Sequence, residues 1–168
     1  RGAPCSGRCS EGIVHYEPTE LVVSVRAGTA LKDLQDALSA SGQMLPFEPP
    51  AFGEVATIGG TIASGLSGPS RPYRGAARDF VLGVRCLNGK GEVLRFGGEV
   101  MKNVAGYDIA RLITGSMGTL GILTEVSLKV LPSPAYSETR TYEMRLDDAF
   151  GLMTSLLSRP LPVSASAF

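Results

Sequence analysis

The sequence predicts an α+β protein. Three features carry this prediction: short β-branched runs joined by tight turns, one well-delimited amphipathic helix, and a hairpin signal at NGKG, residues 88–91. With 168 residues, the chain is long enough for one domain, or for one domain and part of another.

The first part of the chain predicts a hairpin followed by a helix. Residues 12–18 and 21–28 are short runs rich in Val, Ile and Tyr, and two residues join them, which is typical of paired strands. Three leucines then recur at helical spacing between Thr29, the expected N-cap, and Gly42, the expected stop. The proline-rich segment MLPFEPP that follows is expected to be extended.

The middle of the chain predicts a second hairpin and a short helix. Strands are expected on both sides of NGKG. A helix is expected from about residue 108 to 114, with Gly115 as its C-cap, and a strand should follow and end at Pro132.

The character of the sequence changes after Ser133. TRTYEMRL alternates like a strand, DDAFGLMTSLLSRP is helical with an acidic first turn, and LPVSASAF is again strand-like. We interpret residues 135–168 as the first β-α-β of a second domain, residues 12–134 as the main domain, and residues 1–11 as an irregular start.

Composition excludes several classes of function. Sixteen Lys and Arg balance sixteen Asp and Glu, so the formal net charge is zero and a nucleic-acid-binding module is disfavoured. Apolar residues make up 43% of the chain, enough for a core, yet no run is long enough to span a membrane. We expect a cytoplasmic protein.

The cysteines and the histidine do not predict a metal site. Cys5 and Cys9 would need two further ligands, and His15, the one histidine, lies in a strand-like run. Cys86 lies in an apolar run and is expected in the core. An odd number of cysteines without an evident pair fits a reducing compartment.

Glycine is locally enriched in two runs, TIGGTIASGLSGP at 57–69 and GSMGTLGI at 115–122. Such runs expose backbone N–H groups that a large polar cofactor can use, although a glycine-rich surface loop is an equal alternative. Neither run is a phosphate-binding P-loop, because no G-K-[ST] follows, and neither is a Rossmann G-x-G-x-x-G after a strand.

Two polar clusters accompany the glycine runs. Arg71, Arg74 and Arg78 place three guanidinium groups within eight residues, and these could hold a substrate carboxylate, a pyrophosphate or an acidic partner surface, or could simply be solvated. Asp79 is expected to cap a loop. Lys102, Asn103, Tyr107 and Asp108 form a second cluster, in which we interpret Tyr107 as a core residue with its hydroxyl satisfied.

The blocks FEPP, SGPSRP, FGGEVMKNVAGYD and GSMGTLGI make the chain resemble a known family from about Gly12 to Phe168. It is similar to the FAD-binding subunits of bacterial glycolate oxidases, within the PCMH-type FAD-binding family named for vanillyl-alcohol oxidase and p-cresol methylhydroxylase.

The resemblance implies two subdomains that hold FAD between them, followed by a cap domain. This chain would be the second subdomain, with a mixed or antiparallel sheet and flanking helices, and the start of the α+β cap. The first subdomain would lie upstream, so this fragment alone is expected to bind FAD weakly. The FAD is expected to be non-covalent, because neither His15 nor Cys86 is placed to link it.

Carried over by position, the resemblance assigns cofactor contacts to both glycine runs and no catalytic residue or metal ligand. The expected FAD-binding residues are Thr57, Gly59, Gly60, Ser64, Gly65, Ser67, Gly68, Gly118, Gly121 and Ile122.

The resemblance also implies an activity: oxidation of glycolate to glyoxylate with FAD as the acceptor, in a complex with a sister flavin subunit and an iron–sulfur subunit. Two alternatives stay open. The chain could be a non-catalytic or electron-relay assembly subunit, or part of another FAD-linked enzyme such as a D-lactate dehydrogenase.

Overall fold

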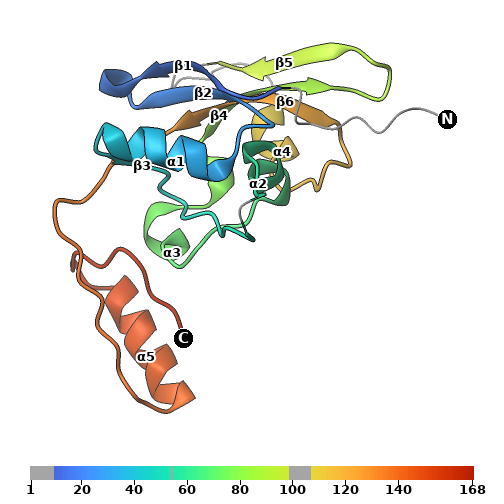
Figure 1. Ribbon diagram of the computed structural model, residues 1–168. Coiled ribbons are helices and arrows are strands. Elements are labelled where there is room, and N and C mark those ends of the chain that lie inside the picture. Colours follow the sequence, from blue (N-terminus) through green and yellow to red (C-terminus); the bar gives the residue numbers. More distant parts are fainter. Residues whose placement is uncertain (1–9, 54, 99–106) are drawn as a thin grey trace.

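The computed structural model describes residues 10–53, 55–98 and 107–168. The chain is an α+β protein built on one five-stranded antiparallel sheet, with strand order β1-β2-β6-β4-β5 (Figure 1). Its strands are β1 (Ile13–Glu17), β2 (Val22–Arg26), β4 (Val81–Leu87), β5 (Val93–Gly97) and β6 (Ile122–Lys129). The predicted fold class is thus confirmed.

Five helices and a small second sheet complete the described chain. The helices are α1 (Leu31–Ala40), α2 (Ile58–Ser64), α3 (Arg71–Arg74), α4 (Ile109–Ile113) and α5 (Leu146–Leu157). The second sheet pairs β3 (Gln43–Met44) with β7 (Leu131–Pro132), and two 3₁₀ turns cover Pro18–Glu20 and Ala77–Asp79.

Helices α1, α2 and α4 lie on one face of the sheet (Figure 1). Helix α2 packs on β2 and β6, and α4 packs on β4 and β5. The core between these layers contains the three leucines of α1, Val23 and Val25 of β2, and Val126 and Leu128 of β6. The leucine spacing of α1 thus correctly marked its buried face. The central strands are buried over consecutive residues, Val22 to Val25 in β2 and Val126 to Leu128 in β6.

Phe47 of the FEPP segment lies in the middle of this core. The prediction that the segment is extended is wrong in part, because Pro46 and Phe47 lie in a turn and Glu48 has φ +46°. The Phe47 side chain is fully buried and stacks on Phe80, with ring centroids 6.2 Å apart and an interplanar angle of 28°. The segment that leads to α2 is thereby anchored to the start of β4.

Both predicted hairpins form. β1 pairs with β2, and β4 pairs with β5 across NGKG, where the Asn88 side chain accepts hydrogen bonds from the amides of Lys90 and Glu92. Two predicted caps are wrong: Ala30, rather than Thr29, is the N-cap of α1, and Thr114, rather than Gly115, is the C-cap of α4. The Thr29 hydroxyl instead accepts a 2.8 Å hydrogen bond from the Gly12 amide at the start of β1, so a tertiary contact takes the side chain expected to cap the helix.

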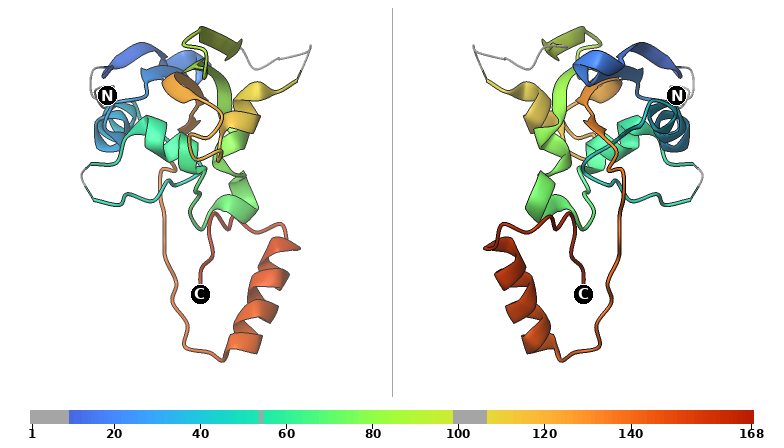
Figure 2. Two further views of the ribbon diagram at one scale, coloured as in Figure 1. Left: turned by 90° about the vertical axis from the view of Figure 1, so that its right-hand side faces the viewer. Right: turned by 90° about the vertical axis from the view of Figure 1, so that its left-hand side faces the viewer.

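After β7 the chain leaves the sheet, forms α5, and returns toward α3 (Figures 1 and 2). The helix matches the prediction, but the flanking segments TRTYEMRL and LPVSASAF contain no strand in the described chain. A strand requires a hydrogen-bonded neighbour, and neither segment is paired with one here. The alternating pattern alone was therefore not sufficient to predict strands.

Candidate functional site

The first glycine run begins as a helix. Thr57 is the N-cap of α2, where its Oγ1 accepts a 3.2 Å hydrogen bond from the Gly60 amide, and Gly65 ends the helix with φ +64°. Ile58 and Ile62 are buried on the core side. This helix was not predicted, although a Thr cap, two isoleucines four residues apart and a terminal glycine were visible signals in the sequence.

The amides of the first turn of α2 are occupied by protein acceptors. Ile58 N donates to the Thr29 carbonyl at 2.9 Å, and Gly59 N donates to the Ala27 carbonyl at 2.7 Å. With the Gly60 amide bonded to Thr57 Oγ1, both glycine amides of this turn have acceptors within the protein. The Thr57 hydroxyl, which accepts from Gly60, still has its own proton to donate.

Gly59 and Gly60 have opposite surroundings. A Cβ on Gly59 would lie 2.8 Å from the Ala27 Cβ and 2.9 Å from the Ala27 carbonyl oxygen, closer than real Cβ atoms approach. A Cβ on Gly60 would meet only Thr57 Oγ1, at 3.3 Å, and this residue is exposed. Gly59 is therefore required by packing of α2 on β2, whereas Gly60 leaves a bare outer surface.

Most of the remaining residues of the first run have structural contacts of their own. Ser64 Oγ donates to the Thr61 carbonyl at 3.0 Å, and Ser67 Oγ accepts from the Ala77 amide at 2.9 Å. A Cβ on Gly65 would lie 2.8 Å from the Gly115 Cα, and one on Gly68 would lie 2.6 Å from the Glu48 carbonyl oxygen. Close backbone packing explains these glycines.

The second glycine run is attached to the last turn of α2. Gly115 N donates to the Ile62 carbonyl at 3.0 Å, and Met117 N donates to the Ala63 carbonyl at 2.8 Å. The two runs, about fifty residues apart in sequence, therefore meet in space. This is the arrangement that a site shared by both runs requires.

Within the second run, Gly118 is open like Gly60, whereas Gly121 is closely packed like Gly59. Gly118 is exposed at φ +75°, and a Cβ added there would have no atom within 4 Å. A Cβ on Gly121 would lie 3.0 Å from the Leu87 carbonyl oxygen. Ile122, the first residue of β6, is 53% exposed and pairs with Leu87 of β4. Gly121 and Ile122 thus lie at the hairpin end of the sheet.

Two features of this run were not predicted. The Ser116 hydroxyl is buried and has no hydrogen-bond partner among the described residues. Met117 has φ +53°, a left-handed conformation that is uncommon for a residue with a side chain. Both features cost stability, and such features are concentrated at functional sites.

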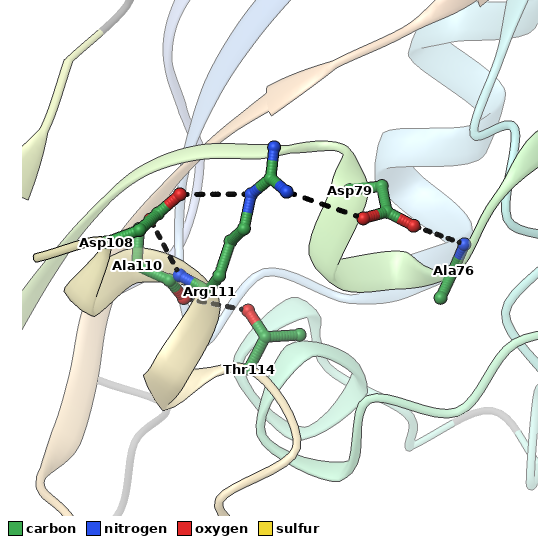
Figure 3. Close-up of polar contacts among 6 residues, drawn as sticks. All are labelled: Ala76, Asp79, Asp108, Ala110, Arg111 and Thr114. Carbon is green, nitrogen blue, oxygen red and sulfur yellow. Dashed lines mark hydrogen bonds and ion pairs between the residues drawn. The ribbon is translucent and has the colours of Figure 1, made fainter. Parts of the chain in front are cut away.

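The segment between α3 and β4 is tied to α4 by one arginine (Figure 3). Asp79 accepts from the Ala76 amide at 2.9 Å, which confirms its predicted capping role, and its other oxygen lies 3.7 Å from Arg111 Nη1. Arg111 Nε is 3.0 Å from an oxygen of Asp108, the N-cap of α4. Because all three side chains are well exposed, these ion pairs each contribute about 0–1 kcal/mol to stability.

The structure separates the other candidates. Cys86 is buried as predicted, and burial raises the pKa of its thiol. His15 is exposed on β1. The interpretation of Tyr107 as a core residue is wrong, since it is 93% exposed. Cys5, Cys9, Lys102 and Asn103 lie outside the described residues. Within the described ranges, no group of three or more His, Cys, Asp or Glu could hold a metal ion.

Two shallow grooves flank the α1 and α2 region. The larger, of about 620 Å³, lies between the N-terminal ends of these helices and contains Thr57 together with Thr29, Asp33 and Val55. The smaller, of about 370 Å³, lies beside β3 and includes Gln43 and Glu48. Of the predicted cofactor residues, only Thr57 lines either groove.

The surface of the two runs fits the expected cofactor. Gly60 and Gly118 leave open, side-chain-free backbone, and Thr57 has a hydroxyl proton to donate. A flat cofactor needs bare backbone of this kind for close approach, and FAD offers many acceptor and donor atoms. The residues that could hold it are therefore Thr57, Gly60 and Gly118, with Gly59, Gly65 and Gly68 shaping the support behind them.

Comparisons with known proteins support FAD as the cofactor. A family model described as FAD binding domain matches residues 7–97. The chain is 52% identical to glycolate oxidase subunit GlcE of Escherichia coli (strain K12), over 99% of this chain and 49% of that relative. It is 34% identical to glycolate oxidase subunit GlcD of Bacillus subtilis (strain 168), over 80% of this chain and 31% of that relative.

A solved structure shares the fold. Alkyldihydroxyacetonephosphate synthase aligns with a TM-score of 0.63 at 29% sequence identity, over 77% of this chain and 23% of that chain. The chain thus spans about half the length of the GlcE relative and less of the other two proteins. Since the family match covers more than half of the chain and includes α2 with its glycine run, the chain belongs to the FAD binding domain family.

Proposed function

We propose that this chain is the second FAD-binding subdomain of a glycolate oxidase subunit, and that residues 135–168 begin its cap domain. The observation that carries the proposal is the meeting of the two glycine runs at α2, with open backbone at Gly60 and Gly118. The division into domains is supported by the core, because the sheet and α1, α2 and α4 bury one shared set of apolar residues, whereas α5 lies apart from them (Figure 2).

The proposed reaction is the oxidation of glycolate to glyoxylate, in which the CH–OH group loses two electrons and two protons. FAD, when bound, supplies the two-electron acceptor. The described residues contribute position: Gly60 and Gly118 admit the cofactor closely, and the Thr57 hydroxyl offers a hydrogen bond. Non-covalent attachment is supported by Cys86, whose buried thiol with its raised pKa is a poor nucleophile.

We expect the 168-residue chain to bind FAD weakly and the full-length protein to bind it tightly. The reason is that the two glycine runs form one open wall, and the opposite wall is assigned to the upstream subdomain. Both proteins are titrated with FAD while flavin fluorescence is followed. Equal and tight affinity would contradict the proposed division of the cofactor site.

A second candidate function is an assembly subunit whose FAD relays electrons while a sister subunit oxidises the substrate. It is favoured by His15, the one histidine of the chain, which is exposed on β1 rather than placed beside either glycine run. A general base must lie within hydrogen-bonding reach of the proton that it removes, and no residue within either run is titratable. Glu48, whose carboxylate lies beside Gly68, is bonded to the Ser70 amide.

We therefore expect the isolated full-length subunit to oxidise glycolate slowly or not at all. Activity should appear only when a sister flavin subunit and an iron–sulfur subunit are added. The measurement is bleaching of flavin absorbance by glycolate, with D-lactate as the competing substrate, in the isolated subunit and in the complex. If the isolated subunit turns over glycolate with a dye acceptor as fast as the complex does, the dependence on partners is wrong.

The proposed location is cytoplasmic, with contact to the inner membrane through partner subunits. Across the described part of the chain, none of the helices has the length and apolar character that a membrane crossing requires.

A further inference from the structure

We infer that the segment from Gly68 to Asp79 is a preformed docking surface for an acidic face of a partner subunit, with Arg71, Arg74 and Arg78 as its contact groups. The inference rests on the proposed function in one respect, that the chain works within a complex. It concerns where the complex is held together, not where FAD binds.

The first half of this segment is fixed to the FEPP segment. The Gly68 amide donates to the Phe47 carbonyl at 2.9 Å, the Ser70 amide donates to Glu48 Oε2 at 3.0 Å, and the buried Ser70 hydroxyl donates to the Pro46 carbonyl at 3.1 Å. Because Phe47 and Pro46 are fully buried, these bonds tie the start of α3 to the core.

The fixation includes a strained residue. Glu48 has φ +46°, and Gly68 packs so closely on it that a Cβ would lie 2.6 Å from the Glu48 carbonyl oxygen. A left-handed glutamate is held only where its surroundings determine the conformation, and such strain is concentrated at functional positions. Here it fixes the loop that carries the arginines.

The second half is fixed as well. The Ala77 amide donates to Ser67 Oγ at 2.9 Å, and Asp79 caps the Ala76 amide and reaches Arg111 (Figure 3). α3 also touches the C-terminal segment, where Tyr73 Oη donates to Ser166 Oγ at 3.1 Å. An ordinary solvated loop would not have its backbone held at both ends and in the middle.

The guanidinium groups, in contrast, are left without acidic partners. Arg71 and Arg78 are exposed and Arg74 is half-buried against Met44, yet none of the three forms an ion pair within the described ranges. The two nearby carboxylates are occupied, Glu48 by the Ser70 amide and Asp79 by Ala76 and Arg111. A rigid backbone with unpaired arginines loses little entropy on meeting carboxylates.

The geometry favours an acidic protein surface over a substrate carboxylate or a pyrophosphate as the group that these arginines bind. Neither of the two grooves is lined by any of these arginines, so neither groove presents them to a small carboxylate or a pyrophosphate. The formal net charge of zero gives no general attraction to nucleic acid. Arginine is enriched at protein interfaces, and Arg71 and Arg78 are exposed at α3 and just after it.

The test uses the full-length subunit and the purified sister flavin subunit of the same complex. Association rates are measured by surface plasmon resonance at several salt concentrations for the wild type and for Arg71→Glu/Arg74→Glu/Arg78→Glu. We expect the triple variant to associate roughly tenfold or more slowly, with a flattened salt dependence, and to keep its flavin content.

A matched control carries the same change in charge at other exposed positions, Lys90→Glu/Arg145→Glu/Arg159→Glu. We expect this variant to associate within about threefold of the wild type, since charges far from a contact are largely screened by salt. An equal slowing of both variants, unchanged association of the first, or loss of its flavin would each overturn the docking surface. Absence of any wild-type association would overturn it too. The proposed function is tested separately, by the bleaching of flavin absorbance by glycolate in the reconstituted complex.

Discussion

Replacing Gly59 by alanine is expected to lower the free energy of unfolding of the full-length protein by about 2–3 kcal/mol. The added Cβ would lie 2.8 Å from the Ala27 Cβ and 2.9 Å from its carbonyl oxygen. That carbonyl cannot retreat without losing the 2.7 Å bond from the Gly59 amide. The strain therefore outweighs the gain of about 0.5–1 kcal/mol that alanine normally gives over glycine inside a helix.

The measurement is urea unfolding followed by circular dichroism. The control is Gly151→Ala in α5, where a Cβ would meet no atom within 4 Å, and this variant should be unchanged or slightly more stable. If Gly59→Ala were as stable as the wild type, α2 would have to lie farther from β2 than the structure places it.

The elements that could be predicted from sequence were those with a strong local signal. The leucine spacing of α1 coincides with its buried face, and the two hairpins are marked by β-rich runs on either side of a short turn. The Thr29 cap could not be predicted, since the amide of Gly12 competes for that hydroxyl only after the chain has folded. The strands expected around α5 failed for a related reason, because sequence alternation does not supply the neighbouring strand.

The candidate site was predictable in its location and not in its details. Glycine enrichment correctly marked two segments that meet at α2. It could not distinguish a glycine needed for packing, such as Gly65 against Gly115, from one that leaves open surface, such as Gly118. The same intrinsic preference against glycine in helices concealed α2, which forms because its first turn bonds to Ala27 and Thr29.

Gly60→Val tests the open surface directly, because this residue follows Gly59 in the same helical turn and has the opposite environment. We expect the full-length variant to lose most of its FAD, with roughly tenfold lower flavin content after purification, since a branched side chain would occupy the surface assigned to the cofactor. Its stability without flavin should match that of the wild type freed of flavin. The only atom near the new Cβ is Thr57 Oγ1, at 3.3 Å, and valine is better tolerated than glycine in a helix.

The readouts are the ratio of flavin to protein absorbance and the unfolding midpoint of the flavin-free protein. Ser64→Ala is the matched control: it changes the same helix, but its hydroxyl is bonded to the Thr61 carbonyl and should not be needed for the cofactor. Full flavin occupancy in Gly60→Val would remove this residue from the site and leave Gly118 as its open glycine. Loss of flavin together with unfolding would instead show that Gly60, like Gly59, is required for the packing of α2 on the sheet.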